Sequence, residues 1–202
     1  AVDQVGGPQI RNIGTIGGNV CNGVTSADSA ALLFTLNAVL ELTGPKGTRE
    51  IPVAEFYTGP GRTLREHAEI LTAIKITREN YQGFYGHYTK YGKRNAMEIA
   101  TLGCAVHVKL SADNMRISEF RLGFGVAAPT PIRCFKTEET VKGMAVTDPE
   151  LYEKIQEGAV SEVTPRSSWR ASREFRLQLV RELSVRTAKE AIEKASGGEA
   201  DA

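Results

Sequence analysis

Three strand-like runs in the middle of the chain constrain its fold more than any other feature. Each is rich in β-branched and aromatic residues, and they occupy residues 84–91, 99–110 and 115–126. In the second run, Val106 and Val108 alternate with His107, a period of two that is typical of a sheet with one face in water. Turn residues at 111–114 join the last two runs. We therefore expect a three-stranded antiparallel sheet with one solvated face.

Helical patterns follow these strands. Pro149 stands in the first turn of a helix that we expect to end near residue 163. Phe175, Leu179 and Leu183 then recur at a spacing of four, which places apolar side chains on one face of a long helix. We expect these C-terminal helices to pack on the sheet.

The N-terminal part begins differently. Residues 9–22 are rich in Gly and Asn and predict a loop with a tight double-glycine turn. Thr25 or Ser26 is the expected cap of a helix that continues through the apolar stretch 30–38.

A hairpin and a further strand complete this part of the chain. Residues 39–53 predict two short strands around a Gly/Pro turn, and residues 70–76 alternate as a strand does. A polar stretch precedes Gly83. The predicted fold class is therefore α+β, with an α/β unit at residues 1–82 and the antiparallel sheet with its helices at residues 83–202.

Composition excludes several classes of protein. The 25 Lys and Arg residues balance 24 Asp and Glu residues, which argues against a nucleic-acid partner. No apolar run approaches the roughly 20 residues that span a bilayer, so we expect no membrane association. The cysteines lack metal-ligand spacing and are odd in number, as expected for core residues in a reducing cytoplasm; they are Cys21, Cys104 and Cys134. We interpret the three histidines as structural.

A Gly-Gly segment is the best candidate for a binding site. Gly17 and Gly18 can take positive φ and expose backbone N–H groups to an anion, and Thr15 and Asn19 add side-chain hydrogen bonds. Pyrophosphate suits such a segment, but a tight turn without a ligand explains the pattern equally well. The spacing matches neither the P-loop nor the Rossmann fingerprint.

Beyond this segment, several motifs resemble one family. The run QIRNIGTIGGNVCNGVTSADS at residues 9–29 is similar to the second flavin-binding loop of the FAD subunits of molybdenum hydroxylases. The FAD-binding subunits of bacterial xanthine dehydrogenases resemble it most. The similarity continues in the same order at residues 69–71, 90–99, 125–133 and 165–172.

The resemblance implies a set of cofactor-binding residues and no catalytic ones. In the family this second loop wraps the FAD pyrophosphate, which here implies Thr15, Ile16, Gly17, Gly18 and Asn19. The resemblance implies that Asp28 contacts the ribityl and ring side of the flavin and that the backbone of Thr72 lies against the isoalloxazine. It also implies that Lys90 lies at the carbonyl or N1 edge of the flavin ring. A cation there would stabilise an anionic reduced flavin. Without the resemblance, Lys90 would be an exposed lysine at a strand end and Asp28 a first-turn acid of a helix.

Two further segments match the family with less specific roles. Residues 91–98 match a loop that influences access of NAD in relatives, and Lys93, Arg94 and Glu98 are candidates for gating or NAD contact; a solvated connection between strands is an equal alternative. We interpret the prolines at 129 and 131 and the motif at 165–172 as architectural, positioning a helix or a subunit interface without chemistry.

The resemblance also implies a larger assembly. A partner subunit holds the molybdenum cofactor, another holds 2Fe-2S clusters, and FAD passes the electrons to NAD. Relatives carry an earlier AGGT-like loop, so we expect this sequence to lack the N-terminal segment of such a subunit. The alternatives are a related hydroxylase acting on aldehyde, carbon monoxide, nicotinate or aromatic acyl-CoA, or a non-catalytic fragment that docks partner subunits.

Overall fold

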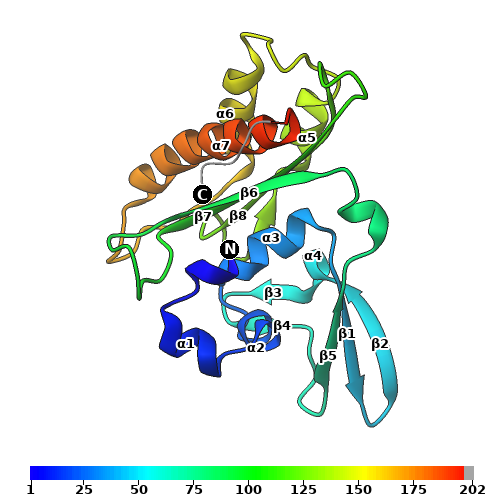
Figure 1. Cartoon of the computed structure of the whole chain (residues 1–202). Coiled ribbons are helices and arrows are strands. Elements are labelled where there is room, and N and C mark those ends of the chain that lie inside the picture. The colour runs from blue at the N-terminus through cyan, green and yellow to red at the C-terminus, as the bar shows by residue number, and fades with distance from the viewer. Residues whose placement is uncertain (198–202) are drawn as a thin grey trace.

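The computed structural model describes residues 1–197. These residues form three antiparallel sheets, and helix α3 packs between the two larger ones (Figure 1). The first elements are η1 (Val2–Gln4), α1 (Pro8–Ile13), α2 (Ile16–Cys21), α3 (Asp28–Thr35), β1 (Val39–Gly44), β2 (Gly47–Pro52), α4 (Val53–Phe56), β3 (Tyr57–Gly59), β4 (Arg62–Thr63), β5 (Ile70–Lys75) and η2 (Arg78–Asn80). The remaining elements are β6 (Tyr85–Tyr91), β7 (Leu102–Leu110), β8 (Ile117–Gly125), β9 (Ile132–Arg133), α5 (Phe135–Val141), α6 (Leu151–Glu162) and α7 (Arg173–Ala195).

The N-terminal sheet has the strand order β2-β1-β5, all antiparallel. The predicted hairpin and the predicted strand near residue 70 are therefore confirmed. Leu40 and Leu42 point to the same side of β1 and are fully buried, as alternation along a strand requires. They pack in one cluster with Phe34 of α3 and Phe56 of α4. This small core supports the helices that carry the predicted flavin residues.

Residues 9–22 form two short helices, so the predicted loop is wrong. Pro8 opens α1, and Thr15 caps α2 by accepting a hydrogen bond from Gly18 N at 2.9 Å. Gly17 and Gly18 lie inside α2 and neither has a positive φ. The glycine-rich composition favoured a turn, but the hydrogen bond that Thr15 accepts from Gly18 N stabilises the start of a helix instead.

The helix that follows also starts differently from the prediction. Ala27 occupies its N-cap and makes no side-chain capping bond. Thr25 instead donates to the Ala128 carbonyl at 3.1 Å and accepts from Val126 N at 3.2 Å. These bonds attach the segment before α3 to the connection between β8 and β9.

The C-terminal sheet has the order β6-β7-β8-β9, all antiparallel. The three long strands and the α+β fold class are confirmed. The sequence prediction missed β9, which consists of the two residues after Pro131. It also missed α5. Both short elements depend on contacts with β8, which no local pattern in the sequence records.

The expectation of one solvated sheet face is wrong. Figure 1 shows α7 on one side of this sheet and α3 on the other. Residues from Leu102 to Val108 are consequently all buried. His107, on the face expected in water, forms a 2.8 Å hydrogen bond between Nδ1 and Thr35 Oγ1 of α3. Burial, followed by the charges of Arg121 and Arg133, lowers the pKa of His107 to about 4, so its ring is neutral near pH 7.

The predicted long helix is confirmed as α7. Ser172 caps it by accepting from Phe175 N at 3.1 Å. Its apolar face, including Leu179, Val180 and Leu183, packs on β6, β7 and α6. Burying each such side chain contributes about 1.5–3 kcal/mol. None of the helices in residues 1–197 is long and apolar enough to cross a membrane.

The cysteines are free, and two of them are core residues as predicted. Cys104 and Cys134 are fully buried, whereas Cys21 is half-buried. Burial raises the pKa of the Cys104 thiol to about 12. Cys104 therefore serves packing in its thiol form.

Candidate functional site

A buried ion pair joins the two parts of the chain that carry the predicted flavin residues. Lys90 Nζ, at the end of β6, lies 2.8 Å from Asp28 Oδ2, at the start of α3. Both side chains are less than a tenth exposed, so Lys90 is not the solvated strand-end lysine that the sequence also allowed. A buried pair alone adds little stability, but removing either partner leaves an uncompensated charge and costs about 3–5 kcal/mol.

Two further hydrogen bonds fix this pair. Tyr88 donates its hydroxyl to Asp28 Oδ1 at 2.9 Å, and burial, with the charge of Asp28, raises the pKa of that phenol, so it remains a donor. Lys90 Nζ also donates to the Gln4 carbonyl at 2.7 Å. An ammonium group has three donors. Lys90 therefore keeps one N–H for another acceptor.

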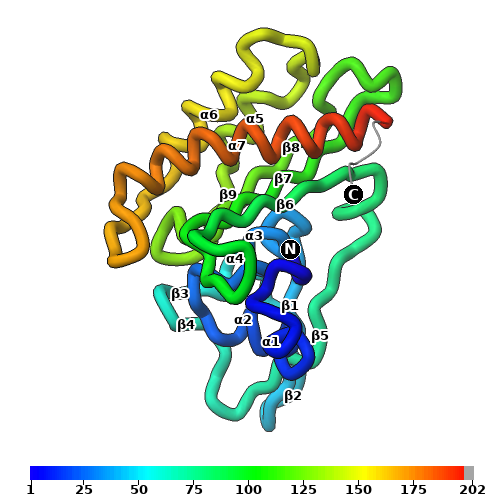
Figure 2. The backbone as a smooth tube through the Cα atoms, turned by 60° about the vertical axis from the view of Figure 1, so that its left-hand side comes forward, coloured from blue at the N-terminus to red at the C-terminus, as the bar shows by residue number. Residues whose placement is uncertain are grey.

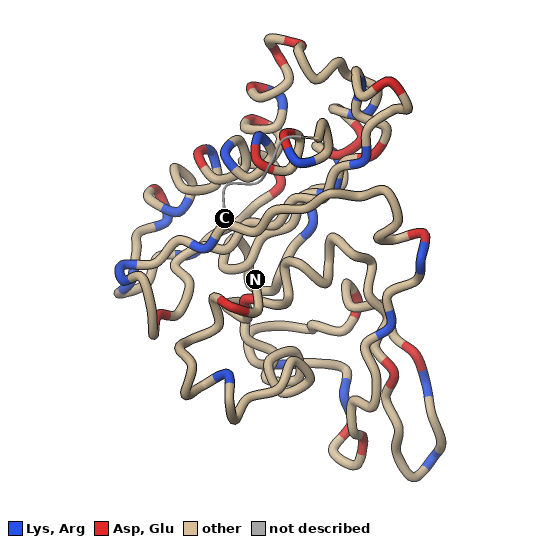
Figure 3. The backbone as a smooth tube through the Cα atoms, viewed as in Figure 1, with Lys and Arg blue, Asp and Glu red and all other residues tan. Residues whose placement is uncertain are grey.

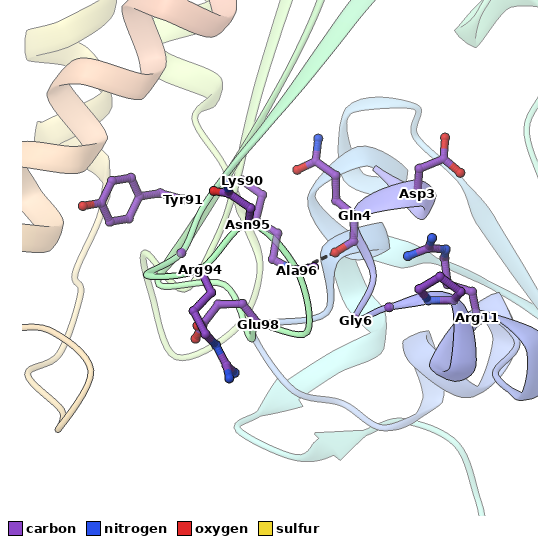
Figure 4. A pocket seen from close by; sticks show the side chains of 13 residues that line it. Asp3, Gln4, Gly6, Arg11, Lys90, Tyr91, Arg94, Asn95, Ala96 and Glu98 are labelled. Carbon is purple, nitrogen blue, oxygen red and sulfur yellow. Dashed lines mark hydrogen bonds and ion pairs between the residues drawn. The ribbon is translucent and has the colours of Figure 1, made fainter.

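Lys90 lines a cavity of about 500 Å³ between the N-terminal segment and the segment after β6 (Figure 4). Asp3, Gln4 and Arg11 approach it from one side, and Arg94 and Glu98 from the other. Figure 2 shows the same neighbourhood in the backbone, with α1 beside the loop that follows β6. The cavity is lined by charges of both signs, which suits a ligand with several hydrogen-bonding groups.

The loop at residues 91–98 is held in place by one bond to the N-terminal segment and by an ion pair within the loop. Met97 N donates to the Gly6 carbonyl at 3.0 Å, which links the loop to the N-terminal segment. Arg94 Nε lies 3.0 Å from Glu98 Oε2. Two of the charged residues singled out in this loop are thus paired with each other at the cavity wall.

A second cavity of about 320 Å³ lies beside α1 and α2. Thr15, Ile16, Gly18 and Asn19 line it together with the apolar side chains Val2, Val5 and Ile10. Ser29 donates to Asn19 Oδ1 at 2.6 Å and so orients the Asn19 amide. The first N–H groups of any helix lack partners within the helix, so the backbone of Ile16 and Gly17 can donate to oxygens.

Together these features fit a flavin dinucleotide. The second cavity offers an apolar wall and, at the start of α2, backbone donors for phosphate oxygens. The first offers the N–H of Lys90 and the guanidinium of Arg94. Arg11 lines both cavities, so one extended ligand could contact both.

Thr72 lies apart from the other predicted residues. Its hydroxyl donates to Glu41 Oε1 at 2.8 Å on the exposed side of β5, and it lines neither cavity. Its neighbour Leu71 faces α2 instead: a Cβ on Gly17 would lie 3.6 Å from Leu71 Cδ2. The flavin contact predicted for Thr72 stays a prediction, as do those of the other seven residues.

The sequence reasoning missed Arg11, Ser29 and Tyr88. Arg11 and Ser29 stand inside the motif at residues 9–29 that carried the resemblance, so that motif contained a signal for them. Tyr88 shares a strand face with Lys90, two residues further on. Among residues 1–197, no group of three His, Cys, Asp or Glu side chains could hold a metal ion.

Comparisons with known proteins follow the two parts of the chain. The family described as FAD binding domain in molybdopterin dehydrogenase matches residues 1–78, and the family described as CO dehydrogenase flavoprotein C-terminal domain matches residues 87–191.

Relatives of known sequence match almost the whole chain. The chain is 46% identical, over 98% of its length, to the xanthine dehydrogenase FAD-binding subunit of Escherichia coli O157:H7. It is 30% identical, over 94% of its length, to the glyceraldehyde dehydrogenase medium chain of Sulfolobus acidocaldarius. It spans 66% of each of these proteins, just under two thirds.

A solved structure shares the fold. The crystal structure of cyanide-inactivated Cu,Mo-CO dehydrogenase contains a chain that superposes with a TM-score of 0.86 at 30% identity. The match covers 95% of the present chain and 65% of that one.

Proposed function

The chain belongs to the FAD-binding flavoprotein subunits of the molybdenum hydroxylase family, and on that premise we propose that it holds FAD and transfers electrons to NAD. The electrons would come from 2Fe-2S clusters in a partner subunit, after a molybdenum-containing subunit has oxidised the substrate. The observation that carries this proposal is the buried Lys90–Asp28 pair at the cavity wall. Two segments far apart in sequence meet there, and both were implicated by the family motifs.

The residues of α2 would hold the phosphates. Thr15 fixes the start of the helix through its bond to Gly18 N, which directs the N–H groups of Ile16 and Gly17 outward. Asn19, oriented by Ser29, adds an amide N–H. A Cβ on Gly18 would come within 3.2 Å of Thr15 Oγ1, so glycine at this position keeps the cap tight.

Lys90 would bind the isoalloxazine ring of the flavin. FAD, when bound, accepts electrons singly and gives up a hydride. Asp28 and the Gln4 carbonyl hold two of the three Lys90 donors and so aim the third into the cavity. Because Asp28 balances its charge, Lys90 acts as an oriented hydrogen-bond donor more than as a bare cation. Tyr88 keeps Asp28 in position and does not itself line the cavity.

The substrate and the acceptor are finer parts of the same proposal. Identity to the Escherichia coli subunit favours xanthine and related purines, with NAD as acceptor, in a cytoplasmic complex. A hydroxylase for aldehydes, carbon monoxide, nicotinate or aromatic acyl-CoA is the alternative. Relatives named for glyceraldehyde, carbon monoxide and nicotinate dehydrogenases support the first three of these substrates. We also propose that the chain divides into two domains, at residues 1–82 and 83–202.

The complex that contains this chain tests the proposal. We expect the purified complex to show a flavin absorption band that NADH bleaches. Lys90→Met should slow reduction of NAD by about tenfold or more, while reduction of the molybdenum centre by substrate is unchanged. Lys109→Met is the matched control, because Lys109 lies on β7 and lines neither cavity.

Two results would contradict it. A complex without a flavin band would remove the cofactor assignment. Equal NAD reduction by the Lys90 and Lys109 variants would remove the role of Lys90 and leave FAD binding intact.

A further inference from the structure

Three arginines meet around a small cavity at the start of α7. Arg166, Arg170 and Arg176 line a cavity of about 70 Å³ together with the hydroxyl residues Ser26 and Ser168. Figure 3 shows basic residues gathered at this end of the molecule, where the chain enters α7. Arg166 and Arg170 belong to the motif at residues 165–172, for which we expected no chemistry, and Arg176 lies in the first turn of α7.

No carboxylate balances these charges within the part of the chain that the structure describes. None of the three arginines forms a salt bridge with residues 1–197. Arg176 is almost fully buried, yet its guanidinium donates only to uncharged groups: the carbonyls of Thr101 and Arg166 and the hydroxyl of Ser168. Burial and the charges of Arg166 and Arg170 hold the pKa of Arg176 below its usual range. The cluster therefore carries excess positive charge around one buried guanidinium, that of Arg176.

Several donors at the cavity have no acceptor among residues 1–197. Arg170 Nε is buried and lacks a hydrogen-bond partner. Ser168 Oγ accepts from Arg176 Nη2 at 2.8 Å and from Arg170 N at 3.3 Å, which leaves its own O–H available. A buried donor without a partner destabilises the folded chain. An acceptor placed in the cavity would remove that destabilisation.

Two acidic residues close in sequence to residues that line the cavity, Glu98 and Glu174, are engaged elsewhere. Glu98 pairs with Arg94 at 3.0 Å. Glu174 has a lowered pKa because its own backbone N–H and the hydroxyl of Ser172 hydrogen-bond to its carboxylate. The missing acceptor is therefore a group from outside this part of the chain.

We propose that this cavity binds a small oxyanion, such as phosphate or a carboxylate group. Guanidinium groups present parallel N–H donors that match two oxygens of such an anion. The volume of about 70 Å³ is several times the ~10–15 Å³ that one water needs, and far too small for a nucleotide. No residue predicted to bind flavin lines it, so this site is separate from the proposed FAD site.

The oxyanion would also connect the two parts of the chain. Ser26 precedes α3, whereas the arginines belong to the segment that enters α7. One anion bonded to Ser26, Ser168 and Arg170 would bridge these segments. Phosphate could arrive free in solution, and a carboxylate could arrive on a side chain of a partner subunit.

The only tryptophan provides a direct readout. Trp169 is mostly exposed, and the Arg170 guanidinium carbon lies 4.2 Å from its ring centroid. We expect titration of the full chain with sodium phosphate, at constant ionic strength, to change Trp169 fluorescence in a saturable way. Arg166→Gln should raise the dissociation constant for phosphate about tenfold, and Ser26→Ala should also weaken binding. Arg166 is exposed, so its variant should fold, which its melting temperature without phosphate checks.

The controls decide between this site and general charge effects. Arg78→Gln removes the same charge on an exposed residue of η2 and should bind phosphate as the parent does. Tighter binding of phosphate than of acetate would identify a free phosphate ligand, and the reverse order would identify a partner's carboxylate. A response no different from sodium chloride for both anions would overturn the proposal, as would equal effects of the Arg166 and Arg78 variants.

Discussion

The N-terminal wall (residues 1–22) and the C-terminal frame (residues 102–195) hold their shapes by different means. In the wall, α1 has no buried residue and α2 buries only Val20, while Ile10 and Ile13 remain exposed. In the frame, β7, β8 and α7 share one continuous apolar core that includes Leu122 and Phe124. The wall depends on caps and hydrogen bonds, whereas the frame depends on packing.

A ligand site between these regions would have a rigid side, formed on the frame, and an adaptable side, formed by the wall. Segments with few buried contacts open locally at low free energy, and a bound ligand stabilises them. Lys90 lies on β6, which pairs with β7 of the frame, and it contacts the wall by donating to the Gln4 carbonyl. The proposed flavin would therefore order the wall while the frame stays unchanged.

The largest expected effect contrasts one apolar residue from each region. Phe124→Ala removes a fully buried ring from the frame and should lower the free energy of unfolding by about 3–5 kcal/mol. Ile13→Ala, where the side chain is 86% exposed, should change it by no more than about 0.5 kcal/mol. Urea denaturation measures both. Similar losses for the two variants would mean that the wall has a core of its own.

A smaller effect concerns the contact between α3 and β7. The pKa of His107 is about 4 in the folded chain, against 6.5 for a free histidine. Below pH 6.5 the unfolded chain binds a proton at His107, whereas the folded chain does not until the pH approaches 4. The contribution of neutral His107 to the free energy of unfolding is therefore complete above pH 6.5 and is lost as the pH falls towards 4. The slope should reach roughly 1.4 kcal/mol per pH unit.

His107→Gln is the matched variant for this pH effect, because glutamine can still hydrogen-bond Thr35 Oγ1 but does not titrate. Its unfolding free energy should fall less steeply between pH 6.5 and 4. Parallel pH profiles for the two proteins would show that His107 does not stay neutral when folded.

The smallest effect is expected at the caps. Thr15→Ala should lower the local stability of α2 by about 1 kcal/mol. We therefore expect faster hydrogen exchange at Gly18 N with little change in the melting temperature of the whole chain. Ser172→Ala removes the equivalent cap of α7 and should lower the global melting temperature, because α7 belongs to the frame. A global loss from the Thr15 variant would contradict the separation of the two regions.

Much of the fold could be predicted from local patterns. The hairpin, the long strands and α7 each have a period and a turn or cap signal within a few residues. The solvated face predicted around His107 was wrong because α3, far away in sequence, covers it. Residues 9–22 became helices because the Thr15 cap outweighs the turn preference of Gly17 and Gly18.

The predicted site residues came from a resemblance, and the structure adds the spatial contacts between them, which composition does not predict. The pairing of Lys90 with Asp28 joins residues separated by most of the first domain proposed above, and no spacing rule connects them. The arginine cluster is similar, since Ser26 meets Arg170 only once α3 and α7 have packed on the same sheet.

Hydrogen–deuterium exchange, measured on the protein freed of flavin and again after reloading with FAD, tests the central claim most directly. We predict that FAD lowers deuterium uptake in residues 1–22 and 90–98 and leaves residues 102–195 unchanged. Unchanged uptake in residues 1–22, or protection confined to residues 102–195, would contradict the account.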